Sequence, residues 1–148
     1  MTFDYSDAWL LQAIKFSESE EQGATLTHVI KAADYIDHAI LTYLEFSVGT
    51  KKLKSIGLII EKDKRLQTTK QFKEWWTKKY EGKSRIVMLK VMAEIKNYLD
   101  KNFMTINEQM TEINTEFTES DFNNSVSEYQ NLASEIIEKL TRTKKAKG

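Results

Sequence analysis

The sequence predicts a mainly α-helical protein with one small β-hairpin, an α+β chain of 148 residues. Three observations predict this class. Apolar residues recur at three- and four-residue spacing over most of the chain, as they do on the buried side of helices. Two short β-prone runs, 58–60 and 66–68, flank a charged stretch, which is typical of a hairpin. The chain has no proline, so helices continue until a glycine or a capping residue ends them.

Two helices are expected before residue 42. The first is predicted over about 7–21, and apolar residues surround much of it, so we expect it at the centre of the fold. Gly23 follows and suits the left-handed residue that ends many helices. The second begins at Thr25 or Thr27, whose hydroxyl can accept from the first free amides, and it fades over 37–41.

The third helix and the hairpin carry the clearest local signals. Thr42 and Glu45 form a capping-box pattern that starts a helix, and Gly57 ends it. The charged hairpin tip, 61–65, lacks the glycine or asparagine that two-residue turns favour, which leaves its turn type open. Gly49 lies inside the third helix, where it costs about 1 kcal/mol against alanine; this indicates either close packing against another element or a kink.

Helical spacing divides the third helix into two sides. The predicted inner stripe consists of Phe46, Gly49 with Thr50, Leu53 and Ile56. The opposite, outward stripe consists of Leu44, Ser47, Lys51 and Lys54, and it is polar and basic beyond its first residue.

Three more helices are expected after the hairpin. The spacing predicts them over about 69–80, 84–101 and 119–140, the last behind a Thr–x–x–Asp capping pattern at 118–121 and before a frayed tail. Residues 104–117 keep a helical apolar spacing but are rich in threonine and asparagine, so helix and loop both remain open for them.

The net charge is zero, but the basic residues are concentrated in the middle of the chain. Residues 1–50 carry two lysines and eight carboxylates, residues 51–90 carry thirteen Lys/Arg and four carboxylates, and residues 91–148 carry seven and ten. Such a basic segment can hold a polyanion, although a solvated lysine-rich helix face explains it equally well.

The order helix, helix, basic-faced helix, hairpin, helix resembles the winged helix-turn-helix superfamily, including small bacterial regulators of the multiple-antibiotic-resistance repressor type. The resemblance rests on 53–59, at the end of the third helix, and on 66–69, the second strand and the following cap. The segment 33–40 also resembles a group of small bacterial winged-helix proteins. The resemblance implies a winged-helix domain over 1–82 and a C-terminal helical extension over 83–148.

This resemblance implies a DNA-binding transcriptional regulator whose recognition helix, about 42–57, enters the major groove beside a basic wing, about 58–69. The residues expected to contact DNA are Ser47, Thr50 and Lys51 toward base edges, Lys52 and Lys54 toward phosphates, and Lys62, Lys64 and Arg65 at the wing tip. The alternative is a protein–protein interaction module that keeps the fold without binding DNA. Three features favour it: a helix start that presents Leu44 and Glu45 instead of base-reading side chains, the zero net charge and the abundant apolar stripes. The link 37–41 is also longer than the usual turn of the family.

Other candidate sites are weaker. Asp34 and His38, four residues apart, could hold a metal ion, but no third ligand lies at a suitable spacing, so surface positions are the preferred interpretation and no metal is expected. Trp75 and Trp76, with neighbouring aromatic residues, could line a small-molecule pocket or a subunit contact; a place in the core is the alternative.

The sequence contains no P-loop, nucleophile elbow, zinc motif or dinucleotide fingerprint, so we expect neither an enzyme nor a cofactor. It contains no cysteine, the N-terminus does not resemble a signal peptide, and no apolar run approaches ~18 residues. We therefore expect a cytoplasmic protein without a membrane segment. The C-terminal apolar stripes are too regular to face water, so they pack either on the winged domain or on a second chain. The resemblance to regulators that dimerise through terminal helices favours a homodimer.

Overall fold

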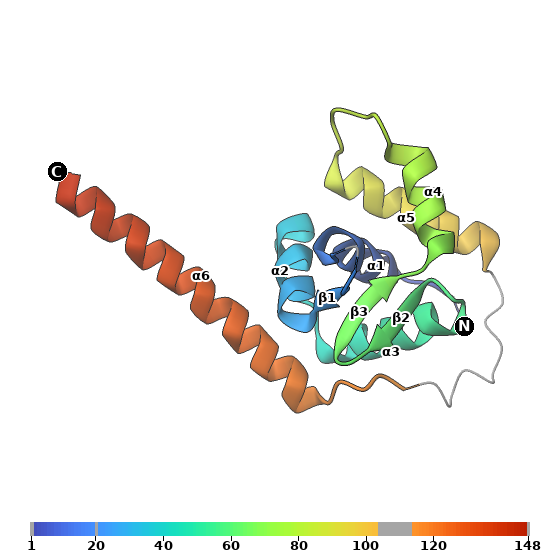
Figure 1. Ribbon diagram of the computed structural model, residues 1–148, viewed down its shortest axis with the longest axis horizontal. Coiled ribbons are helices and arrows are strands. Elements are labelled where there is room, and N and C mark those ends of the chain that lie inside the picture. The colour runs from blue at the N-terminus through green and yellow to red at the C-terminus, as the bar shows by residue number, and fades with distance from the viewer. Residues whose placement is uncertain (1, 20, 104–113, 148) are drawn as a thin grey trace.

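The computed structural model describes residues 2–19, 21–103 and 114–147, with side chains as far as residue 141. The described chain is mainly helical and contains a small three-stranded antiparallel sheet, which confirms the predicted class at this level (Figure 1). Its elements are α1 (Tyr5–Ser17), β1 (Ala24–Thr25), α2 (Leu26–Asp37), α3 (Tyr43–Ser55), β2 (Ile59–Lys62), β3 (Arg65–Thr68), α4 (Lys70–Tyr80), α5 (Met88–Asn102) and α6 (Glu119–Lys147).

Helix α1 lies at the centre of the fold, as predicted, and contacts α2, α3 and α5 (Figure 1). Its residues from Asp7 to Ile14 are all buried, because neighbours surround this helix on several sides. The indole nitrogen of Trp9 donates to the carbonyl of Ala33 at 2.8 Å, so even the polar atom of this ring is satisfied inside the protein.

The sheet has the strand order β1-β3-β2, and β2 and β3 form the predicted hairpin. Asp63 and Lys64 connect them with φ angles of 53° and 59°, the pattern of a type I′ turn, which resolves the turn type. Neither residue is glycine, so both adopt a left-handed backbone conformation that is unfavourable for residues with a side chain. The short strand β1, which pairs with β3, was not predicted because it spans only two residues.

Helix α3 begins with the predicted capping box. Thr42 Oγ1 accepts from the amide of Glu45 at 3.1 Å, and the Glu45 carboxylate accepts from the amide of Thr42 at 2.9 Å. Inside the helix, a Cβ at Gly49 would lie 2.9 Å from Cδ2 of Leu10 and 3.2 Å from Oδ1 of Asp7. Close packing against α1 therefore explains the glycine, because no side chain fits between the two helices.

Several predicted boundaries differ from the structure. Helix α1 ends at Ser17 instead of residue 21, and the carboxylate of Glu18 just beyond it accepts from the amide of Thr68 at 2.7 Å. Helix α5 begins at Met88, four residues later than predicted, and α6 continues to Lys147 where a frayed tail was expected. Residues 114–118 are not helical, and the rest of the ambiguous stretch 104–117 lies outside the described residues.

The buried core continues past residue 82, where the sequence suggested a boundary. Val91, Ile95 and Leu99 of α5 belong to the same apolar cluster as the residues of α1 to α4. The rings of Trp75 and Tyr98 stack at 4.7 Å between α4 and α5, so the aromatic residues of α4 lie in the packing between helices.

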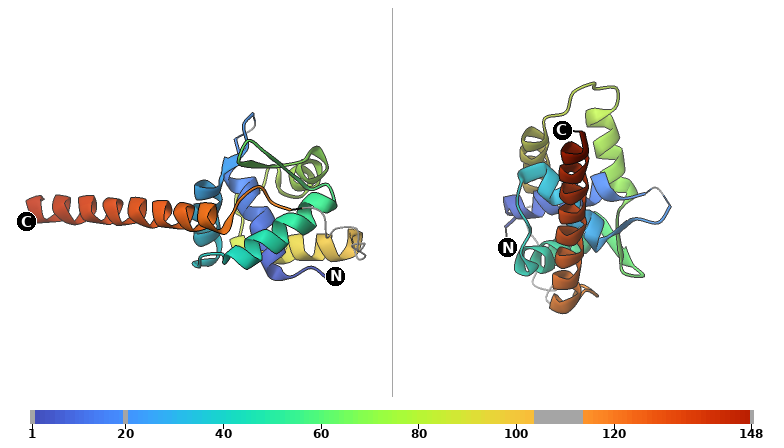
Figure 2. Two further views of the ribbon diagram at one scale, coloured as in Figure 1. Left: turned by 90° about the horizontal axis from the view of Figure 1, so that it is seen from below. Right: turned by 90° about the vertical axis from the view of Figure 1, so that its left-hand side faces the viewer.

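Helix α6 is divided between a docked half and a projecting half. Its first turns lie along α2, where the Tyr129 hydroxyl donates to Asp34 at 2.5 Å and Thr27 donates to Glu128 at 3.1 Å. Beyond these contacts, α6 extends away from the rest of the protein as a single helix (Figures 1 and 2). No helix in the described ranges is long and apolar enough to cross a membrane.

Candidate nucleic-acid interface

The eight residues expected to contact DNA lie on α3 and on the adjacent β2–β3 hairpin. The structure separates them into three groups: two are buried, two are bonded to a C-terminal segment of the same chain, and four lie on the outer sides of the helix and the hairpin. The groups are Thr50 and Lys52; Lys54 and Lys64; and Ser47, Lys51, Lys62 and Arg65.

The expectation that Lys52 reaches a phosphate is wrong. Its side chain is 3% exposed, and its ammonium group lies 2.9 Å from the carboxylate of Asp7, which is 2% exposed. The same nitrogen donates to the carbonyl of Thr2 at 2.9 Å. Lys52 therefore joins α3 to the N-terminal segment, and a buried lysine needs such a partner because an isolated buried charge is very costly.

The expectation that Thr50 faces a base edge is also wrong. Thr50 is fully buried on the inner side of α3, beside Gly49 and Leu53. Within the described part of the chain, its hydroxyl has no hydrogen-bond partner. The helical spacing that placed Thr50 on the inner stripe was thus the correct guide.

Lys54 is bonded to residues that the sequence did not connect with it. Its ammonium group lies 3.2 Å from the carboxylate of Glu61 on β2 and donates to the carbonyl of Asn114 at 3.0 Å. The Glu61 side chain is completely buried, and it also accepts from the hydroxyl of Thr115 at 2.9 Å and from the amide of Glu116 at 2.6 Å. A strand residue therefore holds a segment that lies more than 50 residues later in the chain.

Lys64, at the hairpin tip, contacts the same C-terminal segment. Its ammonium group lies 3.1 Å from the carboxylate of Asp121, donates to the carbonyl of Glu116, and lies 5.2 Å from the ring centre of Phe117. The pKa of Asp121 is held below its usual value, first by the hydrogen bond from the Thr118 amide and then by the one from Lys64. The predicted capping pattern at 118–121 is confirmed, because the amide of Asp121 also donates to Thr118 Oγ1 at 3.0 Å.

We call residues 114–122 the C-terminal strap. It crosses between α3 and the hairpin, where the view from below in Figure 2 shows it running over both. Phe117 is 5% exposed and meets Phe46 edge-on at 5.7 Å, while Phe122 lies 5.5 Å from the same ring. The hydroxyl of Tyr43 donates to the carbonyl of Phe117 at 3.2 Å. Apolar packing and hydrogen bonds together fix the strap on this surface.

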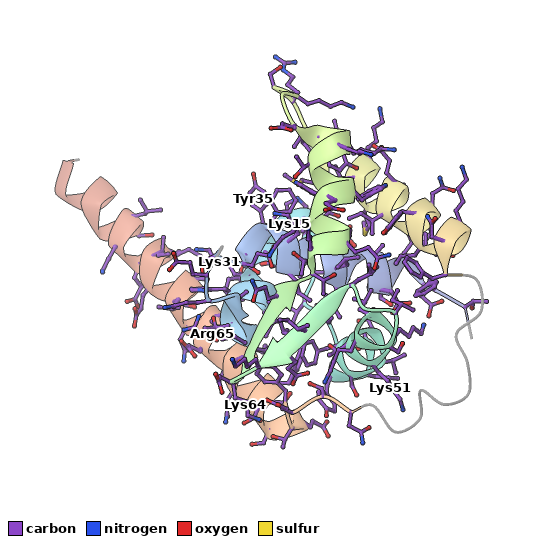
Figure 3. The ribbon with its side chains drawn as sticks, turned by 45° about the vertical axis from the view of Figure 1, so that its right-hand side comes forward. Lys15, Lys31, Tyr35, Lys51, Lys64 and Arg65 are labelled. Atoms are coloured by element: carbon purple, nitrogen blue, oxygen red, sulfur yellow. The ribbon has the colours of Figure 1, made fainter. Side chains whose placement is uncertain are left out.

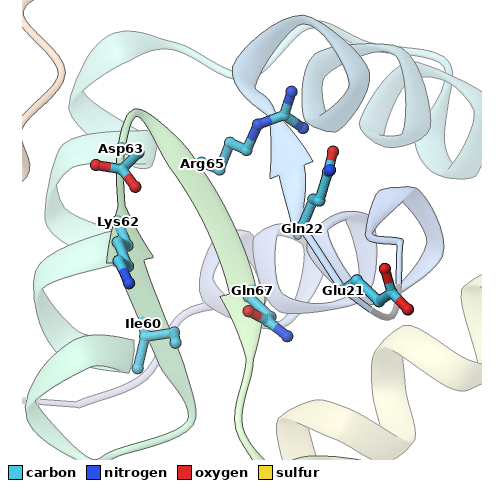
Figure 4. Close-up of a pocket in the computed structure, with 7 residues that line it drawn as sticks. All are labelled: Glu21, Gln22, Ile60, Lys62, Asp63, Arg65 and Gln67. Atoms are coloured by element: carbon cyan, nitrogen blue, oxygen red, sulfur yellow. The ribbon is translucent and has the colours of Figure 1, made fainter.

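Lys62 and Arg65 occupy the outer face of the hairpin. They are direct cross-strand partners, although like charges in this position repel each other. With Glu21, Gln22 and Gln67 they line an open hollow of about 570 Å³ (Figure 4). The carboxylates of Glu21 and Asp63 also line the hollow, so among its described lining residues only the adjacent pair of Lys62 and Arg65 offers positive charge to an anionic partner.

The outer side of α3 combines polar and apolar side chains. Lys51 projects away from the body of the protein (Figure 3), and Ser47 is half-buried one turn earlier. Leu44 is 72% exposed and Val48 is 37% exposed on the same side. The outer stripe is therefore less basic than the sequence suggested, because Lys54 is engaged by Glu61.

Asp34 and His38 both have structural roles at the end of α2 and in its contact with α6. Asp34 accepts the hydroxyl of Tyr129, and His38 caps α2 in a left-handed conformation, with φ of 54°. Among the described residues, no group of three or more potential ligands could hold a metal ion.

The Asp34–Tyr129 contact gives a pH-dependent prediction. The hydrogen bond to Asp34, followed by burial, raises the pKa of Tyr129 to about 12. Because the folded state holds this proton more tightly than the unfolded chain, the stabilisation is complete below about pH 10 and is lost as the pH rises through about 12. We expect Asp34→Asn to lower the pKa of Tyr129 toward 10, measured from ultraviolet difference titrations against Tyr129→Phe. An unchanged pKa in Asp34→Asn would show that the hydrogen bond is absent in solution.

Comparisons with known proteins give no further guide to this surface. No protein-family model, no curated protein and no solved structure matches the chain.

Proposed function

We propose that the protein is a winged-helix DNA-binding transcriptional regulator that acts as a homodimer through its C-terminal helices. The proposal rests on the order of elements, in which α3 is followed directly by the β2–β3 hairpin, and on the cations that both elements carry. In this arrangement α3 approaches the major groove and the hairpin approaches the backbone, so Lys51, Lys62 and Arg65 lie toward phosphates.

One observation carries this proposal beyond the order of elements. The surface between α3 and the hairpin accepts an acidic segment, because the strap lies there with Asp121, in the first turn of α6, on Lys64 and a backbone carbonyl on Lys54. Phosphate oxygens bind lysine in the same way as these carboxylate and carbonyl oxygens. Duplex DNA and the strap therefore compete for Lys54 and Lys64 in this proposal.

The test is a titration of a labelled generic duplex, followed by fluorescence anisotropy at about 50 and 200 mM salt. Each phosphate contact contributes about 0.9 to the slope of log affinity against log salt. We expect Lys51→Ala/Lys62→Ala/Arg65→Ala to weaken binding at low salt and to reduce this slope by about 3. The matched control, Lys78→Ala/Lys83→Ala/Lys90→Ala, removes the same charge from α4, the α4–α5 connection and α5, and it should change the slope much less.

A second function is favoured by the apolar pair on α3. Leu44 and Val48 are exposed one turn apart, at the place where a recognition helix carries its base-reading side chains. An exposed apolar pair suits a protein partner, so the alternative is an interaction module that has kept the fold without DNA binding. If neither the wild-type protein nor a variant with a displaced strap binds duplex at low salt, the first proposal is refuted and this one takes its place.

A further inference from the structure

The projecting half of α6 leaves a row of large apolar side chains in water. Leu132, Ile136, Ile137 and Leu140 are 48%, 58%, 63% and 60% exposed over about three turns of helix. Isolated apolar residues on a surface are ordinary, but a contiguous row along one helix marks an interaction surface.

This row continues a stripe that is already buried. Phe122, Val126 and Tyr129 pack onto the body of the protein, with spacings of four and three residues. The same alternation continues through Ala133, Ile136 and Leu140, while Leu132 and Ile137 widen the stripe on either side. We call this continuous stripe the α6 seam. Its first half is covered by the chain's own core, and its second half has the pattern of a coiled-coil helix that needs a partner.

We infer that the projecting half of α6 pairs with the same half of a second copy in an antiparallel coiled coil. This inference rests on the proposed homodimer and adds the orientation and the register of its helices. Both follow from two independent features of α6, the position of its docked half and the distribution of its charges.

The docked half excludes a parallel pair in register. A parallel partner helix would run along the whole α6 seam, including the part from Phe122 to Tyr129. Helix α2 already occupies that space, where Asp34 and Thr27 hold α6 by hydrogen bonds of 2.5 and 3.1 Å. An antiparallel partner overlaps only the projecting halves, and the two bodies then lie at opposite ends of the coiled coil.

The charges of α6 also favour the antiparallel arrangement. Within the projecting half, residues 130–138 contain two Glu and no Lys or Arg, whereas residues 139–148 contain five Lys or Arg and no Asp or Glu. Packed helices lie about 8–10 Å apart, which is close to the screening length at physiological salt. Antiparallel pairing places the basic end of each helix beside the acidic part of the other, while parallel pairing places the two basic ends together.

The α6 seam also gives the register. In the antiparallel pair, the two α6 helices can overlap only as far as the docked half of each. This limit is reached when Ile136 of one helix lies opposite Leu140 of the other. Residue 133 then lies opposite residue 143 of the partner. In this register, residue 133 of one copy and residue 133 of the other are offset by ten positions, which correspond to about 15 Å along the helix axis. The same offset separates the two copies of residue 143. A disulfide allows only roughly 7 Å between Cα atoms, so neither position can cross-link with itself.

Because the chain contains no cysteine, disulfide cross-linking can read this register directly. We expect Ala133→Cys and Thr143→Cys, each alone, to form no cross-linked dimer under mild oxidation. A mixture of the two variants should form a heterodimer joined through the two introduced cysteines. Cross-linked homodimers of each single variant, with no cross-linked heterodimer in the mixture, would overturn the antiparallel arrangement and leave only a parallel dimer.

Sedimentation of the full-length protein tests whether α6 joins two copies at all. We expect Ile136→Glu/Leu140→Glu to weaken the dimer at least about 100-fold, since both positions are central in the α6 seam. The control Asn131→Glu/Ser134→Glu adds the same charge at exposed positions outside the seam and should leave the dimer intact. A wild-type protein that is still monomeric at about 100 μM would refute both the homodimer and this inference. The duplex titration is a separate experiment. If the expected cross-links form but the protein does not bind duplex DNA, only the proposed DNA function is refuted.

Discussion

Replacement of Lys52 by methionine is expected to destabilise the protein by about 3–5 kcal/mol, the cost of breaking one side of a buried ion pair. The reason is the carboxylate of Asp7, which is 2% exposed and lies 2.9 Å from the lysine nitrogen. Without Lys52, this carboxylate would remain buried, with the amide of Asp4, at 2.7 Å, as its one hydrogen-bond donor among the described residues. Since natural domains are stable by about 5–15 kcal/mol, the free energy of unfolding measured in urea should fall by a large fraction.

The double variant Asp7→Asn/Lys52→Met tests the cause of this loss. It removes both charges but keeps a side-chain oxygen for the amide of Asp4, so it should lose less stability than the two single variants together. Lys62→Met provides the control, because Lys62 is exposed and its replacement should cost no more than about 0.5 kcal/mol. A loss below about 1 kcal/mol in Lys52→Met would contradict the buried pair.

Displacement of the C-terminal strap is expected to increase the affinity for duplex DNA at least about tenfold. Phe117→Ala removes the ring that packs on Phe46 and under Lys64, and such a truncation costs about 3–5 kcal/mol in a core. A loss of this size lowers the equilibrium constant for docking of the strap more than 100-fold. Lys54 and Lys64 then become available to phosphates, and the salt dependence should steepen by about 2 in slope.

Hydrogen exchange provides the check on the strap itself. In Phe117→Ala, the amides of the strap should exchange much faster, including the amide of Glu116 that donates to Glu61. Leu89→Ala is a suitable control, because Leu89 is 55% exposed on α5, outside both the strap and the α6 seam. A freed strap with unchanged DNA affinity would show that the strap and DNA do not share a surface, and would remove the competition from the proposed function.

Local signals predicted much of the fold. The capping pairs Thr42–Glu45 and Thr118–Asp121 start their helices as expected, because both partners of each pair lie within four residues. Gly49 marked a close approach of α3 to another element, which proved to be α1. These features depend on neighbouring residues or on one helical turn, so their geometry can be derived from the sequence alone.

The candidate site was less predictable, because the residues that decide it are distant in sequence. Lys51 and Lys52 are adjacent, yet Lys51 projects from the body of the protein, while Lys52 is buried against a carboxylate that lies 45 positions earlier in the chain. The partners of Lys54 and Lys64 in the strap lie 60 and 57 positions away, at Asn114 and Asp121. Helical spacing separates the sides of a helix, but it does not reveal which later segment covers one of them.

The long sequence distance between the hairpin and the strap has a consequence for biosynthesis. The segment from α1 to β3 is complete once Thr68 has been made, but Phe117, which covers Phe46, is added only about 50 residues later. At about 5–20 residues per second, the nascent chain spends several seconds with this aromatic face and its lysines uncovered. Every newly made molecule therefore passes through an open form, in which it can meet the ribosome's own RNA or a chaperone before its last helix arrives.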